Sequence, residues 1–558
     1  MKNIKILQCK TLFIGVFIIF QISQIKGQAW DWASSFNAEG YSNGICRDTS
    51  GNILICGKFN SPTITFGSYT LSATGSTNTA YIAKYDSNGN TLWAKTSTGG
   101  NAQCNAVNTD GENFYITGSY YGPSIIFDSY KLTASGKYNA FLLKYDSNGN
   151  LIWAKSSNGQ SQGVCSGSSI SLDAAGNIYI TGSFAASPFT FDTTSLPNAG
   201  AFNIFVAKYD NNGQCLWAKG PTGTGYNFGR SVSADVLGNV FVTGVFQQQT
   251  ITFGSITLTN TDNTGNNDVF LAKYDTNGNI LWAQNAIGTG DDIGASVSTD
   301  INGNAYLTGY SSSPILAFGS STINAQFGST FLTKYDANGN IIWAKSPVLY
   351  SNHSSSGSFV YITANSVYVT GFFFPQVTFG SHTLTASNYT TNPDPMFIVQ
   401  YDLNGNVVNA ASLESGGSGQ NFICADKFCN AYITGNFQPD SLIIGNDTLK
   451  GSTSSNPFLA KLSFACQTQG LNELSNNNYG TSIFPNPNNG VFKIKIDSEI
   501  KDGELIIINQ LGQKVFTQKI TEGDNNIISN WLSAGLYHYT ILQNKQQVGN
   551  GKLIIEKD

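Results

Sequence analysis

Short runs of alternating apolar and polar residues, separated by turns rich in Gly and Asn, fill most of this chain. The pattern of residues 169–219 predicts one unit of four strands. The strands are predicted at 169–173, 177–182, 204–210 and 215–219. In the second strand, Ile178 and Ile180 alternate with Tyr179 and Thr181, which is the period of a strand with two different faces. Because no long segment shows helical periodicity, we predict an all-β chain.

The unit recurs along the chain through the phrase Lys-Tyr-Asp-x-Asn-Gly-Asn, two apolar residues, and Trp-Ala. Copies and variants lie at 84–94, 144–154, 208–218, 273–283, 334–344 and, weakened, 400–410, with a truncated copy at 458–462. Successive Tyr residues of the phrase are 60 to 66 residues apart. A β-helix would need a stricter period, whereas the blades of a β-propeller tolerate loop insertions. The repeat therefore predicts a propeller.

The two ends of the repeat region predict how such a ring closes. Trp32 and Ala33 match the fourth strand of a unit, and the last unit lacks that strand. Joining the two ends completes a seventh unit and removes exposed sheet edges. We therefore predict that residues 28–466 form a seven-bladed β-propeller, closed by pairing of the N-terminal strand with the last repeat. The repeats resemble the bacterial β-propeller repeats called SBBP, a resemblance that implies fold more than function.

The N-terminal segment has the pattern of a signal peptide. Lys2, Lys5 and Lys10 precede an apolar run at 12–20. The run is about 10 residues long, too short for a bilayer that needs about 20, so a membrane anchor is the weaker alternative. No second transmembrane candidate is found in the sequence. We predict that residues 1–27 are a signal peptide, with cleavage between Gly27 and Gln28.

The composition changes after Cys466: residues 467–480 read as a polar linker, and 481–558 as a small β-sandwich. The sandwich resembles the C-terminal sorting domain of type A substrates of the type IX secretion system. The matching positions are Phe484, Pro485, Asn486, Pro487, Gly490, Gly512, Gln513, Gly535 and Tyr537. The resemblance implies passage through the periplasm, recognition by the type IX machinery, and release or attachment at the cell surface. The alternative is an ordinary accessory sandwich of a secreted protein.

Charge and residue types exclude several kinds of chemistry. The formal net charge is −5 and no basic cluster is visible, which disfavours nucleic acid as a partner. His353, His382 and His538 lie far apart, so we predict no zinc site and no Ser-His-Asp triad. Each Asp-x-Asn-Gly-Asn loop offers one carboxylate, whereas calcium takes six to eight oxygens. We therefore predict hairpin turns supported by Asp, and neither a metal nor a cofactor.

Eight cysteines remain after the predicted signal peptide, an even number that permits disulfides in an exported protein. Two pairs flank predicted hairpin turns, and a third occupies similar places in neighbouring units. The candidate pairs are Cys46–Cys56, Cys424–Cys429 and Cys104–Cys165.

These patterns favour a secreted or surface-bound, non-catalytic propeller that binds a glycan or a protein. One alternative is an extracellular enzyme that degrades polysaccharide or peptide with carboxylates at the propeller channel; another is an adhesin with many weak contacts. Unmatched acids at the channel would favour the enzyme, and unmatched aromatics there would favour binding. The acids outside the repeat frame are Asp291, Asp292 and Glu414, and the aromatics are Tyr120, Tyr121, Tyr226, Tyr310, Phe373 and Phe374. The repeated Trp residues are predicted to pack the blades.

Overall fold

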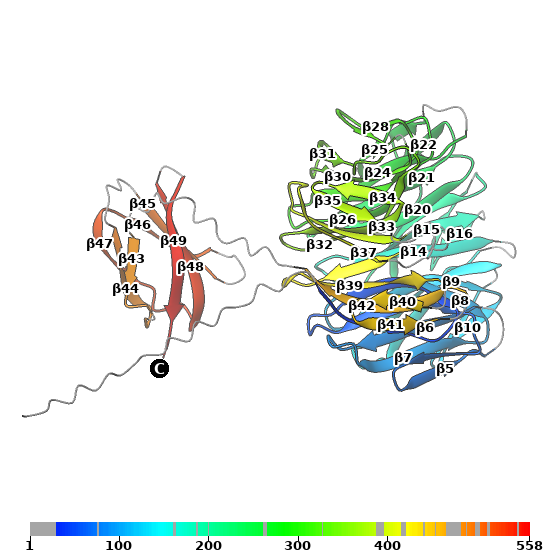
Figure 1. The fold of residues 1–558 in the computed structure, drawn as a ribbon, viewed down its shortest axis with the longest axis horizontal. Helices are drawn as coiled ribbons and strands as arrows, with labels where there is room; N and C mark the ends of the chain where they lie inside the picture. Colours follow the sequence, from blue (N-terminus) through cyan, green and yellow to red (C-terminus); the bar gives the residue numbers. More distant parts are fainter. Residues whose placement is uncertain are drawn as a thin grey trace, which may run out of the picture. The chain divides into compact units, whose positions relative to one another are not determined.

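The computed structural model describes residues 29–557 apart from short segments. The segments left out are 75–77, 135, 160–162, 186–187, 199, 261–264, 326, 387–394, 414–419, 439–440, 452–453, 465–480, 487, 497–502, 510–513 and 544–545. The chain divides into two compact units, 1–466 and 467–558 (Figure 1). The described residues contain strands and no helix, so the all-β prediction is confirmed.

The first compact unit repeats an antiparallel group of four strands, here called a repeat unit. The first repeat unit consists of β2 (Gly40–Arg47), β3 (Ile53–Phe59), β6 (Thr79–Tyr85) and β7 (Thr91–Thr98). The second consists of β8 (Asn101–Thr109), β9 (Phe114–Tyr121), β12 (Tyr138–Tyr145) and β13 (Leu151–Ser156). The third consists of β14 (Val164–Leu172), β15 (Ile178–Ala185), β18 (Asn203–Tyr209) and β19 (Cys215–Lys219).

The next three follow the same order along the chain. The fourth consists of β20 (Asn227–Ala234), β21 (Val240–Phe246), β24 (Asp268–Tyr274) and β25 (Ile280–Asn285). The fifth consists of β26 (Asp292–Thr299), β27 (Ala305–Ser311), β30 (Ser329–Tyr335) and β31 (Ile341–Lys345). The sixth consists of β32 (Ser354–Ile362), β33 (Val367–Phe374), β36 (Met396–Tyr401) and β37 (Val407–Leu413).

The last repeat unit combines the two ends of the repeat region. Its strands are β38 (Phe422–Ala425), β39 (Asn430–Phe437), β42 (Asn456–Ser463) and β1 (Ala29–Ser35). Strand β1 pairs antiparallel with β42, with Ala33 opposite Ala460. The strand that the last repeat lacks in sequence is therefore supplied by the N-terminal segment.

Each repeat unit also carries a short hairpin between its second and third strands. The hairpins are β4 (Thr63–Phe66) with β5 (Tyr69–Ser72), β10 (Ser124–Phe127) with β11 (Tyr130–Thr133), β16 (Phe189–Phe191) with β17 (Thr194–Leu196), β22 (Thr250–Phe253) with β23 (Ile256–Thr259), β28 (Ile315–Phe318) with β29 (Ser321–Asn324), β34 (Gln376–Phe379) with β35 (His382–Thr385), and β40 (Ser441–Ile444) with β41 (Asp447–Lys450).

The hydrophobic cores lie between neighbouring repeat units. The second and third strands are buried on both faces; every residue of β18, β21 and β24 is buried. One core joins Tyr179 and Ile204 of one unit to Val232 and Phe270 of the next. The first strands touch one another in chain order, and β2 contacts β38, β39 and β42. The first and last repeat units are therefore neighbours, as consecutive units are.

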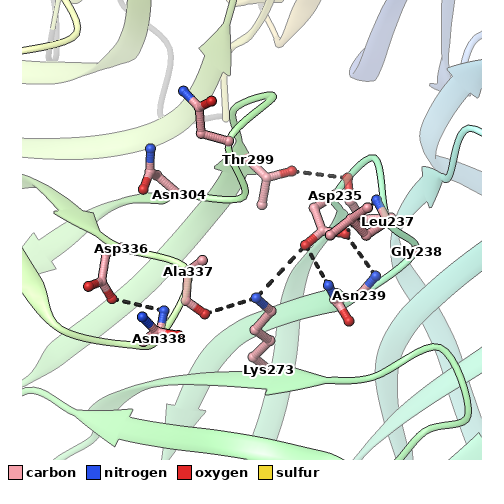
Figure 2. A network of polar contacts seen from close by, with 12 residues as sticks. Asp235, Leu237, Gly238, Asn239, Lys273, Thr299, Asn304, Asp336, Ala337 and Asn338 are labelled. Carbon is pink, nitrogen blue, oxygen red and sulfur yellow. Dashed lines mark hydrogen bonds and ion pairs between the residues drawn. The ribbon is translucent and has the colours of Figure 1, made fainter. Parts of the chain in front are cut away.

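Residues of the repeated phrase hold each unit to its neighbour by hydrogen bonds and packing. Figure 2 shows Lys273 reaching from β24 between the Asp235 carboxylate, 3.8 Å away, and the Ala337 carbonyl of the next unit, 2.9 Å away. The indole N–H of Trp282 donates to the same carbonyl at 3.1 Å. Its ring covers Gly339, where a Cβ would lie 2.8 Å from ring atoms. The phrase thus recurs because it builds the contact between units, as predicted for the Trp residues.

The same contact between a Trp and the next unit also joins β1 to the first repeat unit. The indole N–H of Trp32 donates to the Ser87 carbonyl at 3.3 Å, and the Trp32 ring covers Gly89. The equivalent bonds run from Trp93 to Ser147, from Trp153 to Asn211 and from Trp217 to Thr276.

The second compact unit contains two sheets around its own core. One sheet is β43 (Thr481–Phe484), β44 (Val491–Ile496) and β47 (Gly523–Ile528). The other is β46 (Lys514–Ile520), β45 (Gly503–Ile508), β48 (Gly535–Gln543) and β49 (Gln546–Ile555). In β44, buried Phe492, Ile494 and Ile496 alternate with exposed residues, as a strand with one covered face requires.

Candidate binding cavity

A cavity of about 610 Å³ lies among the first strands of the repeat units. Its lining comes from β2, β8, β14, β20, β26, β32 and β38 and from residues beside them. This volume is that of a site for a small ligand or one segment of a polymer. Since every first strand contributes, the site belongs to the whole set of repeat units and to no single one.

A β-bulge in each of six first strands turns one extra side chain toward this cavity. A bulge places two residues opposite one and re-aims a side chain, a device frequent beside functional sites. The register shifts fall between Ser42 and Gly44, Cys104 and Ala106, Gly167 and Ser169, Gly229 and Ser231, Gly294 and Ser296, and Gly357 and Phe359. The extra residues are Asn43, Asn105, Ser168, Arg230, Ala295 and Ser358, and all of them line the cavity.

Several lining side chains tie one first strand to the next. Asn43 Nδ2 donates to the Cys104 carbonyl at 3.0 Å, and Asn105 Nδ2 donates to the Gly167 carbonyl at 2.7 Å. Ser231 Oγ accepts from the Val297 amide at 3.1 Å. These bonds satisfy polar groups around the cavity and hold its wall in one arrangement.

The charge of the cavity is opposite to that of the chain. Arg47, Lys58 and Arg230 line it, and none of the described residues of its lining is Asp or Glu. The Arg47 guanidinium lies beside the Tyr432 hydroxyl, and the Lys58 ammonium lies 5.2 Å from the centre of the Tyr41 ring. Burial lowers the pKa of Lys58. A cationic cavity in a chain of net charge −5 favours an anionic or hydroxyl-rich ligand.

The aromatic residues of the cavity are not those singled out from the sequence. Tyr41, Phe359, Tyr361 and Phe422 line it, and the rings of Phe359 and Phe422 meet edge to face at 5.4 Å. The lining includes none of the six aromatics that break the repeat frame. Tyr120 and Phe373 are buried within their units, while Tyr121 and Tyr226 are exposed away from the cavity.

The two isolated acids that the structure describes are not in the cavity either. Asp291 and Asp292 do not line it, and Glu414 lies outside the described residues. Both carboxylate oxygens of Asp292 accept hydrogen bonds, from Ser311 at 2.5 Å and Ser313 at 2.7 Å. Burial raises the pKa of Asp292, against the effect of those two hydroxyls. These contacts give Asp292 a structural role.

The Asp of each phrase closes its own turn. Asp86 Oδ1 accepts from the amides of Asn88 and Asn90 at 2.9 Å, and its Oδ2 accepts from Asn90 Nδ2 at 2.8 Å. Burial opposes ionisation of Asp86, but these hydrogen bonds outweigh it and lower its pKa. Within the described ranges no group of three or more His, Cys, Asp or Glu residues could hold a metal ion.

The three predicted disulfide pairs are not formed. Cys46, Cys56, Cys104, Cys165 and Cys424 are free thiols, and Cys429 is disulfide-bonded to a cysteine other than Cys424. The register explains the first pair, because Cys46 lies opposite Leu54 and Cys56 lies opposite Gly44. In the second pair, Cys424 lies opposite Tyr432 in β39 and is fully buried. Cys104 and Cys165 belong to different repeat units.

The other predicted positions lie at the ends of the chain. Gly27, Gln28, Pro487, Gly512 and Gln513 fall outside the described residues. In the second compact unit, Phe484 ends β43 and is followed by Pro485 and Asn486, whose Oδ1 accepts from the Ile554 amide at 2.8 Å. Gly490 has φ +98° and Gly535 starts β48; Tyr537 donates to the Ser533 carbonyl at 2.9 Å. Among the residues whose structure is described, no helix is long and apolar enough to cross a membrane.

Each compact unit contains a segment that matches a known protein family. Residues 482–556 match the secretion system C-terminal sorting domain, and residues 281–315 match the beta-propeller repeat. The chain therefore carries SBBP β-propeller repeats and a type IX sorting domain. It is exported to the cell surface or the extracellular space.

Individual relatives are distant. An uncharacterized WD repeat-containing protein of Acanthamoeba polyphaga mimivirus is 27% identical over 375 residues, which is 54% of this chain and 27% of that protein. The chain thus spans about a quarter of the length of this relative. A Dyadobacter fermentans protein of unknown function has a TM-score of 0.35 at 10% identity, covering 78% of this chain and 99% of its own. A Synechocystis apocarotenoid oxygenase mutant has a TM-score of 0.34 at 12% identity, covering 78% and 95%.

Proposed function

We propose that this protein is a seven-bladed β-propeller, closed by β1, that acts outside the cell as a non-catalytic binding module for a glycan. Closure is supported by the pairing of β1 with β42 and by the Trp32 bond to Ser87. It is also supported by the hydrogen bond from the Ser42 amide to Asn436 Oδ1, 3.0 Å long, between the first and last repeat units. In this arrangement the cavity is the central channel of the ring.

The observation that carries the binding function is the chemistry of the cavity wall. Ser and Asn side chains, backbone groups, four aromatic rings and three cations surround it, and the part of its lining that the structure describes has no carboxylate. Saccharide hydroxyls are matched by such donors and acceptors, and saccharide rings by aromatic faces. The enzyme alternative needs a pair of carboxylates at the channel, as in most glycoside hydrolases. The lining therefore supports binding over hydrolysis.

Incubation of the chain from residue 28 onward with soluble and insoluble polysaccharides tests this proposal. We expect depletion of the protein by at least one polysaccharide, with no new reducing ends in solution. The heat-unfolded chain is the control for non-specific adsorption. Release of reducing ends would contradict the proposal and would direct attention to acids outside the described residues, such as Glu414. Depletion by an immobilised protein alone would favour a protein ligand instead.

A further inference from the structure

Arg230 lies in the cavity wall at a position where the equivalent residues of two other repeat units have a different role. It is the extra residue of the bulge in β20, equivalent to Asn43 in β2 and Asn105 in β8. Those two asparagines bond to the next first strand and so serve the wall itself. No hydrogen bond or ion pair to another side chain is seen for Arg230 in the described part of the chain. Its Nε is buried without a hydrogen-bond partner.

The surroundings of Arg230 make its charge costly to the folded protein. Arg230 is half-buried and its Nε is shielded from solvent, and a cation that loses part of its hydration without gaining a carboxylate partner is destabilised. Burial lowers the pKa of the Arg230 guanidinium, and no acid opposes this effect. The cavity wall contains hydroxyls and amides but, among its described lining residues, no negative charge. Such a group is stabilised when a ligand brings the missing anion.

The backbone on both sides of Arg230 is held by contacts with neighbouring repeat units. A Cβ at Gly229 would lie 2.6 Å from Thr181 Oγ1 of the preceding unit, so only glycine allows that close approach. Ser231, on the other side, bonds both to the Val297 amide and to the Val297 carbonyl. Arg230 therefore projects from a bulge whose backbone is held on both sides, so the point from which its side chain leaves the wall is set before a ligand arrives.

We propose that Arg230 is the anchor for an anionic group, a carboxylate or a sulfate, on the glycan that enters the cavity. This inference rests on the proposed binding function and names its ligand class as an acidic polysaccharide. The planar guanidinium binds a carboxylate or sulfate through two parallel hydrogen bonds. The serine and asparagine hydroxyls and amides, with the four aromatic rings, suit a sugar ring carrying that group better than an extended acidic peptide.

The test compares the exported chain with Arg230→Met and Arg230→Lys in binding to polygalacturonate, dextran sulfate, neutral dextran and poly-glutamate. We expect tighter binding to an acidic polysaccharide than to dextran. Arg230→Met should weaken that binding about tenfold or more, as loss of a charge-assisted bond does, and Arg230→Lys should weaken it less. Preference between polygalacturonate and dextran sulfate identifies carboxylate or sulfate as the anion. Lys131→Met, which removes an equal charge from an exposed position on β11, should change little.

The melting temperature of Arg230→Met is a second measurement. A structural role for Arg230 predicts a change opposite in sign to the one expected for a ligand anchor. Because Arg230 has no anion in the free protein, Arg230→Met should leave the melting temperature unchanged or raise it. A large fall would mean that the guanidinium holds the wall together, and would overturn the inference.

The remaining outcomes separate the inference from the function on which it rests. Binding of neutral dextran as strong as that of acidic polymers, or acidic binding unchanged in Arg230→Met, overturns the anchor but leaves glycan binding intact. Arg230-dependent binding of poly-glutamate without acidic polysaccharide overturns the ligand class. Failure to bind any polysaccharide overturns both the inference and the proposed function.

Discussion

A chain that ends before residue 481 is expected to accumulate in the periplasm and to be absent from the cell surface and the medium. The physical basis is that the sorting signal is itself a folded domain. Its two sheets enclose a core of buried residues such as Ile494, Leu505 and Ile541, separate from the repeat units. Deleting it should leave the repeat units folded but without the surface that the type IX machinery recognises.

Fractionation of cells into periplasm, outer surface and medium measures this effect. The reciprocal control attaches residues 467–558 to another periplasmic protein, which should then appear outside the cell. The Arg230→Met variant is a further control, because it changes the cavity and leaves the sorting domain intact. Normal surface delivery of the truncated chain would contradict the assignment.

Trp282→Ala is expected to lower the free energy of unfolding by about 3 kcal/mol, since truncating a large aromatic in a packed site costs about that amount. The substitution removes the bond to the Ala337 carbonyl, the cover over Gly339 and the edge-to-face contact with Phe241 at 5.7 Å. Lys273 would keep its bond to the same carbonyl, so the contact between units is weakened and not abolished.

Urea unfolding of the exported chain, followed by tryptophan fluorescence and by circular dichroism, measures the loss. Leu281→Ala is the matched control: this neighbouring side chain on the same strand is 49% exposed and should cost well under 1 kcal/mol. Equal effects of the two substitutions would show that the repeated Trp does not connect the units.

The turns could be predicted because their chemistry is local. Asp86, for example, bonds to amides two and four residues later, so one phrase specifies its own turn wherever it occurs. The repeated Trp was predicted to pack because its position never varies, although its partner lies about 55 residues away in the next unit.

The cavity could not be predicted in the same way, because its special residues stand between the repeated phrases. Arg230 lines it only because an extra residue enters β20, and a bulge has no strong compositional sign. A signal was nevertheless present: Gly-x-Ser recurs at Gly167, Gly229 and Gly294, and the middle residue varies. Each of these glycines meets the Thr of the preceding unit.

The disulfide predictions failed for a related reason. Flanking a turn does not place two cysteines opposite each other, because the register decides which residues pair. The turn between β2 and β3 places Cys46 opposite Leu54 and Cys56 opposite Gly44.

A cysteine pair across the junction of β1 and β42 tests the closed ring most directly. Ala33 lies opposite Ala460, and the Ala33 amide donates away from β42, to Asp447 Oδ2 at 2.9 Å. The two alanines therefore form a non-hydrogen-bonded pair, whose Cα atoms lie close enough for a disulfide. In a closed ring, Ala33→Cys with Ala460→Cys should form one disulfide within each chain, found by mass spectrometry of unreduced peptides. The control is Ala33→Cys with Ala83→Cys, which should form no disulfide, since Ala83 is the counterpart of Ala460 in the first repeat unit. Absence of the disulfide between positions 33 and 460, or its formation only between chains, would contradict the closed propeller.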